Sequence, residues 1–534
     1  EVPNDRDDVR PEMGFSHRYL VRTRLDIPAA LDGRGFFLDF QNFNLTASVF
    51  VNGSFCGFSK AHSTSWQCDI TPAVRAGEVN ELVVVFKDAY YGLSTKYAQD
   101  EAVRRMGPRR FWNLPRSTIS HMSGGQHLDM PTAWDTRTGI LEPVALVVTG
   151  PAYATDVFCK PSVEKKQLGL EVTLINPGPD KTTIEVLNQV VPSADGQSDD
   201  VEMSFPPQTV TIDGRGSKTI DLTASWDRPT LWWPDRPHLY CVVTTLNRGG
   251  HPIDVKRTRF GFREWKWDSH MFTLNGVKWP MWADTNYTDS PQKLIELSRA
   301  SHMNQMRYWR KGNWGGMTRR QVLDYFDETG MLVRSSGVFD GQQANYGGGL
   351  RVPDTSQPKD ERGRFPLKAK PELFENWQHQ MTAWLKEERN HPCIYIWSVE
   401  NEIAYINSNN LGQYREVEPA LRDAVEHVMQ IDPTRPAMVD GGNALRDESL
   451  PVNGAHYTEF MGVAFRDFPD AAYTRDHFYN TLQRDAWRMV PDRPIMKGEV
   501  YFANGYSTDR FATIGGDRCF IGIGQTMEAC LLYT

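Results

Sequence analysis

Two glutamates stand at the ends of apolar stretches that are typical of buried strands. The segment Ile394-Tyr-Ile-Trp-Ser-Val-Glu-Asn-Glu402 runs from apolar residues into an acidic end, and Pro494-Ile-Met-Lys-Gly-Glu499 does the same. Hydrolysis of a glycosidic bond needs such a pair, because one carboxyl group protonates the leaving oxygen while the other attacks the anomeric carbon. Either glutamate alone is more typical of a solvated loop. Together they predict a catalytic pair.

The region that must position these residues, 266–534, alternates short apolar strands with amphipathic segments of helix length. Repeated βα units of this kind predict a (β/α)8 TIM barrel. Catalytic groups of barrels lie at the carboxyl ends of the strands, so Glu402 and Glu499 would end the fourth and seventh strands. The expected strands are 278–283, 304–308, 332–334, 393–397, 436–439, 453–456 and 494–497, and the expected helices are 291–302, 319–329, 371–390, 416–430 and 476–490.

The barrel is expected to be incomplete at the C-terminus. Seven strands are recognised where a closed barrel needs eight, and only residues 500–534 follow Glu499. We therefore expect a barrel truncated before strand eight, in a chain that is part of a longer protein. A long segment rich in Gly and charged residues, 339–370, follows the third strand. Such insertions lie at the active face of a barrel.

The first half of the chain predicts two β domains. Residues 1–150 carry short runs of β-branched and aromatic residues, separated by turn signals such as Asn52-Gly53, which is typical of a jelly roll. Residues 151–265 repeat this pattern over the length of one immunoglobulin-like β-sandwich. The strands expected in these two domains are 19–27, 36–40, 47–51, 81–87, 168–175, 182–191, 208–212, 217–222 and 239–246.

Composition excludes several classes of partner. The 534 residues include 59 basic and 67 acidic side chains, so no basic excess points to nucleic acid. No apolar run approaches the ~18 residues of a membrane span. No HExxH, Walker or GxGxxG pattern is present, so neither a metal nor a cofactor is expected. The periplasm or the extracellular space is slightly favoured over the cytoplasm, and the sequence leaves a homo-oligomer open.

The chain resembles glycoside hydrolase family 2, whose members carry a jelly-roll sugar-binding domain, an immunoglobulin-like domain and a catalytic barrel. The resemblance covers nearly the whole chain. Its motifs are Arg259-Phe-Gly-Phe-Arg-Glu264, Asn275-Gly276, Met303-Asn-Gln-Met-Arg-Tyr-Trp309, Tyr325-Phe-Asp-Glu-Thr-Gly330 and Arg389-Asn-His-Pro392, followed by Trp397-Ser-Val-Glu-Asn-Glu402. It implies a retaining exo-β-glycosidase that removes terminal non-reducing β-linked sugars from oligo- or polysaccharides. Glu402 would be the acid/base and Glu499 the nucleophile, although Val500-Tyr501 follows where the family more often has Phe-Gly.

The same resemblance implies further carbohydrate contacts. Asn401 would hydrogen-bond the sugar 2-hydroxyl, Arg307 would keep the nucleophile ionised, and Tyr457 would donate a hydrogen bond to it. Asp284, Trp282 and Trp309 are the other expected substrate-binding residues. Arg307-Tyr-Trp309 resembles the β-mannosidase and exo-β-glucosaminidase branch more than the β-galactosidases, which usually carry His in that stretch. That branch often has a Gly triplet next, where this chain has Arg310-Lys311-Gly312, so the sugar stays open. For Arg307 a surface ion pair is the competing interpretation.

Two alternatives remain. The missing eighth strand often supplies a sugar-stacking Trp in this family's clan, which leaves room for a non-catalytic carbohydrate-binding or scaffold protein on a hydrolase fold. Separately, a basic and aromatic stretch in the first domain either meets an acidic or sulfated sugar or is a solvated run of charges. Its residues are Arg104, Arg105, Arg109, Arg110, Phe111 and Trp112.

Overall fold

The computed structural model forms two compact units, one comprising Glu1–Trp232, His238–Glu264 and Pro371–Pro392, and the other Trp233–Pro237, Trp265–Lys370 and Cys393–Thr534. The described residues are 18–87, 139–192, 194–268, 271–283, 288–309, 314–337, 339, 350–401, 403, 415–440, 450–456 and 493–499. Only the backbone is described at Leu45, His62, Ala455, His456, Ile495, Lys497 and Glu499.

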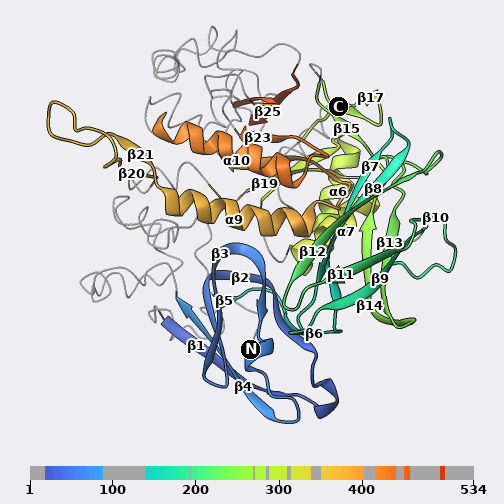
Figure 1. Ribbon diagram of the computed structural model, residues 1–534. Helices are drawn as coiled ribbons and strands as arrows, with labels where there is room; N and C mark the ends of the chain where they lie inside the picture. Colours follow the sequence, from blue (N-terminus) through green and yellow to red (C-terminus); the bar gives the residue numbers. More distant parts are fainter. Residues whose placement is uncertain are drawn as a thin grey trace, which may run out of the picture. The chain divides into compact units, whose positions relative to one another are not determined.

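The first β domain is an antiparallel sheet, whose first four strands are drawn in blue in Figure 1. Its strands are β1 (Arg18–Asp26), β2 (Gly35–Val51), β3 (Ser54–Asp69), β4 (Val79–Lys87), β5 (Gly139–Ile140) and β6 (Val144–Thr149). The order is β1-β4-β2-β3, with β5 and β6 also pairing with β2. The two strands expected at 36–40 and 47–51 are one strand, because irregularities between Phe40 and Asn44 let β2 bend without ending. Asn52 and Gly53 both take positive φ, 50° and 78°, as a two-residue hairpin turn requires.

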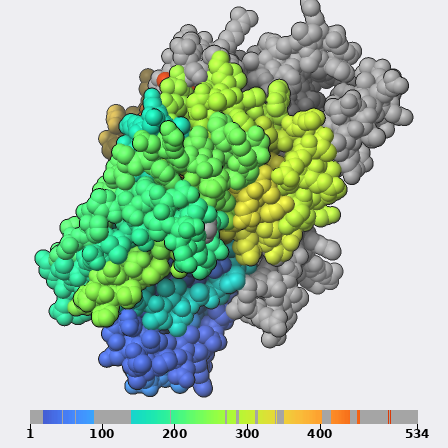
Figure 2. Space-filling model, turned by 90° about the vertical axis from the view of Figure 1, so that its right-hand side faces the viewer, coloured from blue at the N-terminus to red at the C-terminus, as the bar shows by residue number. Residues whose placement is uncertain are grey.

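The second β domain packs two sheets around one core, and its outer surface is drawn in teal and green in Figure 2. One sheet has the order β10-β9-β13-β14 with β11 beside β9, and the other has the order β12-β8-β7. Leu168, Leu170, Val172 and Leu174 alternate along β8 and are buried, as the period of a strand facing a core demands. The strands are β7 (Tyr153–Ser162), β8 (Gln167–Ile175), β9 (Thr182–Val191), β10 (Met203–Ser204), β11 (Gln208–Ile212), β12 (Ser217–Ser225), β13 (Tyr240–Arg248) and β14 (His251–Phe260).

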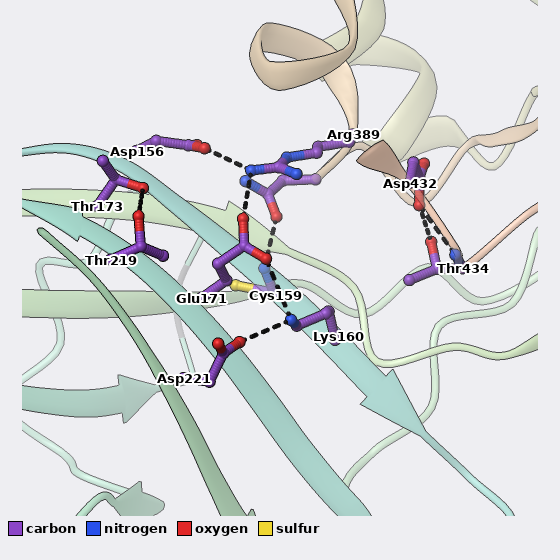
Figure 3. Close-up of polar contacts among 11 residues, drawn as sticks. Asp156, Cys159, Lys160, Glu171, Thr173, Thr219, Asp221, Arg389, Asp432 and Thr434 are labelled. Atoms are coloured by element: carbon purple, nitrogen blue, oxygen red, sulfur yellow. Dashed lines mark hydrogen bonds and ion pairs between the residues drawn. The ribbon is translucent and has the colours of Figure 1, made fainter. Parts of the chain in front are cut away.

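Helix α9 (Pro371–Glu388) belongs to the same unit as the β domains. Its buried residues recur three or four positions apart, which gives one apolar stripe. Directly after the helix, Asn390 accepts the Cys159 N–H at 2.9 Å and donates to Val157 O at 2.8 Å, both on β7. Arg389 pairs with Asp156 and Glu171 beside it (Figure 3). These polar contacts fasten the end of the helix to the second β domain.

The other unit contains the parallel strands of the barrel. The order is β18-β19-β22-β23, with β24 and β25 forming a further parallel pair. Every described side chain of the first four strands is buried, as expected when a parallel sheet is covered on both faces. The strands are β18 (Gln305–Tyr308), β19 (Leu332–Ser336), β22 (Ile394–Asn401), β23 (Ala437–Asp440), β24 (Asn453–His456) and β25 (Ile495–Glu499).

The first expected barrel strand, 278–283, is wrong as a continuous strand. Trp265–Lys266 (β15), Thr273–Leu274 (β16) and Val277–Lys278 (β17) form a small antiparallel sheet instead. A parallel bridge from Ala283 to Gln305 is the part that follows the expected pairing. Within 339–370, Arg351–Pro353 (β20) and Leu367–Ala369 (β21) form a hairpin that the Gly-rich composition did not predict. The expected truncation before strand eight falls on residues outside the described ranges.

The described residues of the second unit contain three α-helices, α6 (Pro291–Ala300), α7 (Arg319–Thr329) and α10 (Glu418–Ile431). Thr318 and Gln321 form a reciprocal capping box that starts α7. Gly330 ends it with φ 77°, and a Cβ there would lie 1.8 Å from Pro234 O, so no other residue fits. The helix expected at 476–490 is not among the described residues. No helix in the described ranges is both long and apolar enough to cross a membrane.

Candidate active site

Arg307, the last residue but one of β18, is the centre of a buried polar network. Its Nε donates to Ser336 Oγ at 2.9 Å, and its Nη2 donates to Asn401 Oδ1 at 2.6 Å. The same Nη2 lies 2.9 Å from Asp440 Oδ2. Ser336, Asn401 and Asp440 end β19, β22 and β23, so the carboxyl ends of four parallel strands meet at one guanidinium. Arg307 is therefore a buried residue, and the surface ion pair considered from the sequence is wrong.

Asp440 also forms an ion pair with a second arginine, Arg334. Its Oδ1 accepts from Arg334 Nη1 at 3.0 Å, and Ser398 Oγ donates to Oδ2 at 2.7 Å. The Asp440 side chain is fully buried, and the side chains of both arginines are at most 4% exposed. A buried carboxylate is stable only when it is paired and hydrogen-bonded. Two cations and a hydroxyl meet that requirement here.

Arg334 connects this network to the strand that carries Glu499. Its Nη2 donates to Gly498 O at 2.8 Å. Gly498 directly precedes Glu499 at the end of β25, and His456 pairs with Glu499 in the parallel register of β24 and β25. Tyr395 on β22 donates from its hydroxyl to Gln305 Oε1 on β18. The same hydroxyl lies 3.8 Å from Met496 Sδ on β25. β25 therefore faces β18 and β22 across the interior of the barrel.

The described residues next to Glu402 in the chain form buried hydrogen bonds. Asn401 N–H donates to Phe339 O at 2.8 Å. Glu400 is buried, and its Oε2 accepts the Ile403 N–H at 2.6 Å, so its carboxylate is hydrogen-bonded inside the protein. Glu402 itself lies outside the described residues.

Aromatic rings pack against the arginines of the site. The guanidinium carbon of Arg307 lies 4.0 Å from the Trp309 ring centroid, and that of Arg319 lies 4.5 Å from Tyr308. Arg319 also donates to Trp309 O at 3.0 Å and to Ser335 Oγ at 3.1 Å. Burial raises the pKa of Tyr395, so its hydroxyl keeps its proton and acts as a donor. These contacts hold the arginines in fixed orientations.

The structure brings together some of the sequence-predicted residues. Asn401, Arg307 and the carbonyl oxygen of Gly498, the residue before Glu499, are linked through Asp440 and Arg334. Trp309 lies against Arg307. Trp282 is 67% exposed, and its backbone N–H donates to Asn304 Oδ1 at 3.0 Å. Asp284, Tyr457 and the charged stretch containing Arg104 are outside the described residues, as is the Glu499 side chain.

Sequence reasoning missed four residues of the network: Arg334, Ser336, Ser398 and Asp440. The signal for Asp440 was present, because it directly follows the strand expected at 436–439. Polar residues at the carboxyl end of a barrel strand are candidates for the active face. Arg334 carried the same signal, because it is the last residue of the strand expected at 332–334.

Two family models match the chain. Glycosyl hydrolases family 2 matches residues 152–263, and the TIM barrel domain of glycosyl hydrolases family 2 matches residues 319–511. The chain belongs to glycosyl hydrolase family 2. The second match includes both Glu402 and Glu499, and the two matches fall on the second β domain and on the parallel barrel.

Other family 2 proteins are similar over much of this chain. The β-galactosidase BoGH2A of Bacteroides ovatus is 21% identical over 96% of the chain and 58% of its own length. A β-galactosidase of Vibrio cholerae is 23% identical over 43% of the chain and 21% of its own length. The crystal structure of a family 2 β-galacturonidase from Eisenbergiella tayi covers 95% of this chain and 78% of its own, with TM-score 0.65 and 17% identity.

The chain thus spans only about a fifth to three fifths of the length of these two curated relatives. The similarity to the solved structure establishes the fold of β domains followed by a TIM barrel. Within that fold, the network around Asp440 brings the end of the strand before Glu402 to the end of the strand that carries Glu499.

Proposed function

We propose that this family 2 chain provides the catalytic pair of a retaining exo-β-glycosidase. Glu499 attacks the anomeric carbon while Glu402 protonates the departing oxygen, which leaves a covalent glycosyl-enzyme. Glu402 then acts as a base toward water, and the water displaces Glu499 so that the sugar leaves with its β configuration. The substrate is a terminal, non-reducing β-linked sugar of an oligo- or polysaccharide.

The observation that supports this proposal is a continuous chain of buried contacts. Asn401 bonds Arg307, Arg307 bonds Asp440, and Asp440 bonds Arg334. Arg334 in turn bonds Gly498 O. The residues that directly precede Glu402 and Glu499 are thus joined within one network, although they are far apart in the sequence. Retaining hydrolysis needs the two carboxyl groups about 5–5.5 Å apart, and strand ends that face each other across one barrel mouth can provide that separation.

The network also supports the proposed roles of Arg307 and Asn401. A cation near a carboxylate favours its ionised form, which a nucleophile requires. Asn401 Oδ1 accepts a hydrogen bond from Arg307, and this contact fixes the orientation of the Asn401 amide. In the proposed mechanism the NH2 group of the same amide is the donor to the sugar 2-hydroxyl. Trp309, packed on Arg307, adds an aromatic face beside the same strand end.

The sugar is to be identified by experiment. Named relatives are a β-galactosidase and a β-galacturonidase, and the sequence motifs also fit β-mannosidases and exo-β-glucosaminidases. The full-length protein should be incubated with 4-nitrophenyl β-glycosides of these sugars. We expect release of nitrophenol from at least one of them, with the β-anomer appearing first in the proton NMR spectrum.

Two variants assign the carboxylates separately. In a retaining enzyme, Glu402→Ala with azide should form a β-glycosyl azide, because azide replaces water on the glycosyl-enzyme. Glu499→Ala with azide should form the α-glycosyl azide, because azide replaces the nucleophile. Glu185→Ala, which changes an exposed glutamate on β9 of the second β domain, is the matched control and should leave turnover unchanged.

The opposite result is equally clear. If no glycoside is hydrolysed while the protein still binds sugars, the chain is a carbohydrate-binding or scaffold protein on a hydrolase fold. If the α-anomer appears first, hydrolysis inverts configuration, and the assignment of Glu499 as nucleophile is wrong.

A further inference from the structure

We propose that Asp440 is the positioning residue that holds both catalytic strand ends in register, through one arginine on each side. This inference rests on the proposed function of Glu402 and Glu499. Asp440 is not part of either sequence motif, and no role in the reaction described above falls to it. Its carboxylate nevertheless contacts both halves of the site.

One arm runs to the acid/base. Asp440 Oδ2 lies 2.9 Å from Arg307 Nη2, which donates to Asn401 Oδ1 at 2.6 Å. Asn401 directly precedes Glu402 in the chain. The second arm runs to the nucleophile, because Asp440 Oδ1 accepts from Arg334 Nη1 at 3.0 Å and Arg334 Nη2 donates to Gly498 O at 2.8 Å. Gly498 directly precedes Glu499.

The bridge depends on fork geometry. A guanidinium presents several donors in one fixed plane. When a carboxylate binds one of its nitrogens, the directions of the other donors are therefore fixed as well. Arg334 uses Nη1 for Asp440 and Nη2 for Gly498 O. Moving or neutralising Asp440 would therefore change the direction of both guanidiniums at once. Ser398, which donates to Oδ2 at 2.7 Å, fixes the rotation of the carboxylate itself.

The charge matters as much as the shape. Two guanidiniums buried at the ends of neighbouring strands repel each other unless an anion lies between them, and in this buried setting solvent screens the repulsion weakly. Asp440 supplies that anion from the end of β23. An uncharged side chain of the same shape would leave the two guanidiniums without an anion between them. The guanidiniums would then move apart or attract the catalytic carboxylates. Either response displaces groups whose spacing the reaction needs to within a fraction of an ångström.

The chain contains a matched control for this proposal. Asp432 is also fully buried and pairs with Arg435, with Oδ2 2.8 Å from Nε, and it accepts from Trp397 Nε1 at 2.9 Å. It lies before β23, at the amino end of the strand, whereas Asp440 is the last residue of β23. In barrels the amino end serves stability and the carboxyl end serves catalysis.

The test compares Asp440→Asn with Asp432→Asn in the full-length protein. Both should lose thermal stability, because each change leaves buried arginines without their anion. Kinetics are measured on the aryl β-glycoside that the wild type hydrolyses, at a temperature where circular dichroism shows the variant to be folded. For Asp440→Asn we expect kcat to fall about 100-fold or more with KM changed less than about threefold. For Asp432→Asn we expect kcat within about threefold of the wild type.

A second variant covers the case in which Asp440→Asn does not fold. Arg334→Lys keeps a cation beside Asp440 but loses the planar fork that also reaches Gly498 O. Its kcat should fall about tenfold or more with little change in KM. A kcat within about threefold of the wild type for either folded variant overturns the proposal. So does an equal loss of kcat in Asp432→Asn, because the effect would then be one of stability alone.

Failure of this inference is distinguishable from failure of the proposed function. Wild-type turnover that both Glu402→Ala and Glu499→Ala abolish upholds the proposed function, whatever Asp440→Asn does. If the wild type hydrolyses none of the glycosides, the proposed function fails, and the positioning role of Asp440 is overturned with it.

Discussion

Arg307 Nη2 lies 2.6 Å from Asn401 Oδ1, in a hydrogen bond that joins the carboxyl ends of β18 and β22. Both residues are buried, with exposed fractions of 3% and 5%. A charge-assisted hydrogen bond in such a place is strong and directional. Through it, the orientation of the residue before Glu402 depends on an arginine almost a hundred positions earlier in the chain.

Arg307→Lys should lower kcat/KM by about 100-fold, because an ammonium group cannot reproduce the planar contacts to Ser336, Asn401 and Asp440 together. Steady-state kinetics on an aryl β-glycoside measure the change. Arg299→Lys is the control, since Arg299 is exposed on α6 and contacts the backbone of Thr329. Equal activity of Arg307→Lys and the wild type would contradict the role of the guanidinium.

Trp282→Ala should raise KM about two- to tenfold with little change in kcat, if its ring stacks on the sugar. A ring that is 67% exposed is available for such stacking, and aromatic contacts contribute about 0.5–1.5 kcal/mol. Trp282→Phe preserves an aromatic face and should keep KM close to the wild-type value. An unchanged KM in Trp282→Ala would show that the ring does not contact substrate.

Arg389→Met should lower the free energy of unfolding by about 2–4 kcal/mol. The arginine side chain is 2% exposed, pairs with Asp156 and Glu171, and lies 4.0 Å from the Phe158 ring centroid (Figure 3). Its removal leaves two carboxylates without their buried cation. Urea denaturation gives the value. Lys181→Met, which breaks an exposed pair with Asp213, should change stability by less than about 0.5 kcal/mol.

Cys241→Ser should make the unfolding free energy fall less steeply as the pH rises into the alkaline range. Burial raises the pKa of the Cys241 thiol to about 11. The folded state therefore keeps a proton that the unfolded thiol releases, so the unfolding free energy falls as the pH rises from about 9 towards 11. A serine does not titrate in this range. Unfolding curves measured between pH 7 and 11 should diverge above about pH 9, and parallel curves for the two proteins would refute this contribution.

Local sequence signals placed several elements correctly. The start of α7 was predictable because Thr318 and Gln321 cap it and an apolar stripe follows, and its end was predictable because Gly330 adopts a left-handed conformation. The strands 182–191 and 208–212 were predicted with their observed bounds. Each of these elements is specified by residues that lie next to one another in the chain.

Other features depended on distant contacts. The bends in β2 that merge two expected strands arise from its pairing with β3, and the sequence 278–283 failed to form a strand although its composition suggested one. The Arg307 motif gave no sign that its guanidinium is buried. Its burial follows from partners on three other strands, and nothing adjacent in the sequence announces them.

The sequence by itself indicated the family and the order of β domains before a barrel, and it predicted the two glutamates at strand ends, because these follow from residue types and short-range periodicity. Only the tertiary structure decided that Asp440 and Arg334 link the strand ends beside those glutamates. The physical reason is that a hydrogen bond depends on distance and direction in space. Residues at 307, 334, 401, 440 and 498 come within reach of one another only when parallel strands align their carboxyl ends.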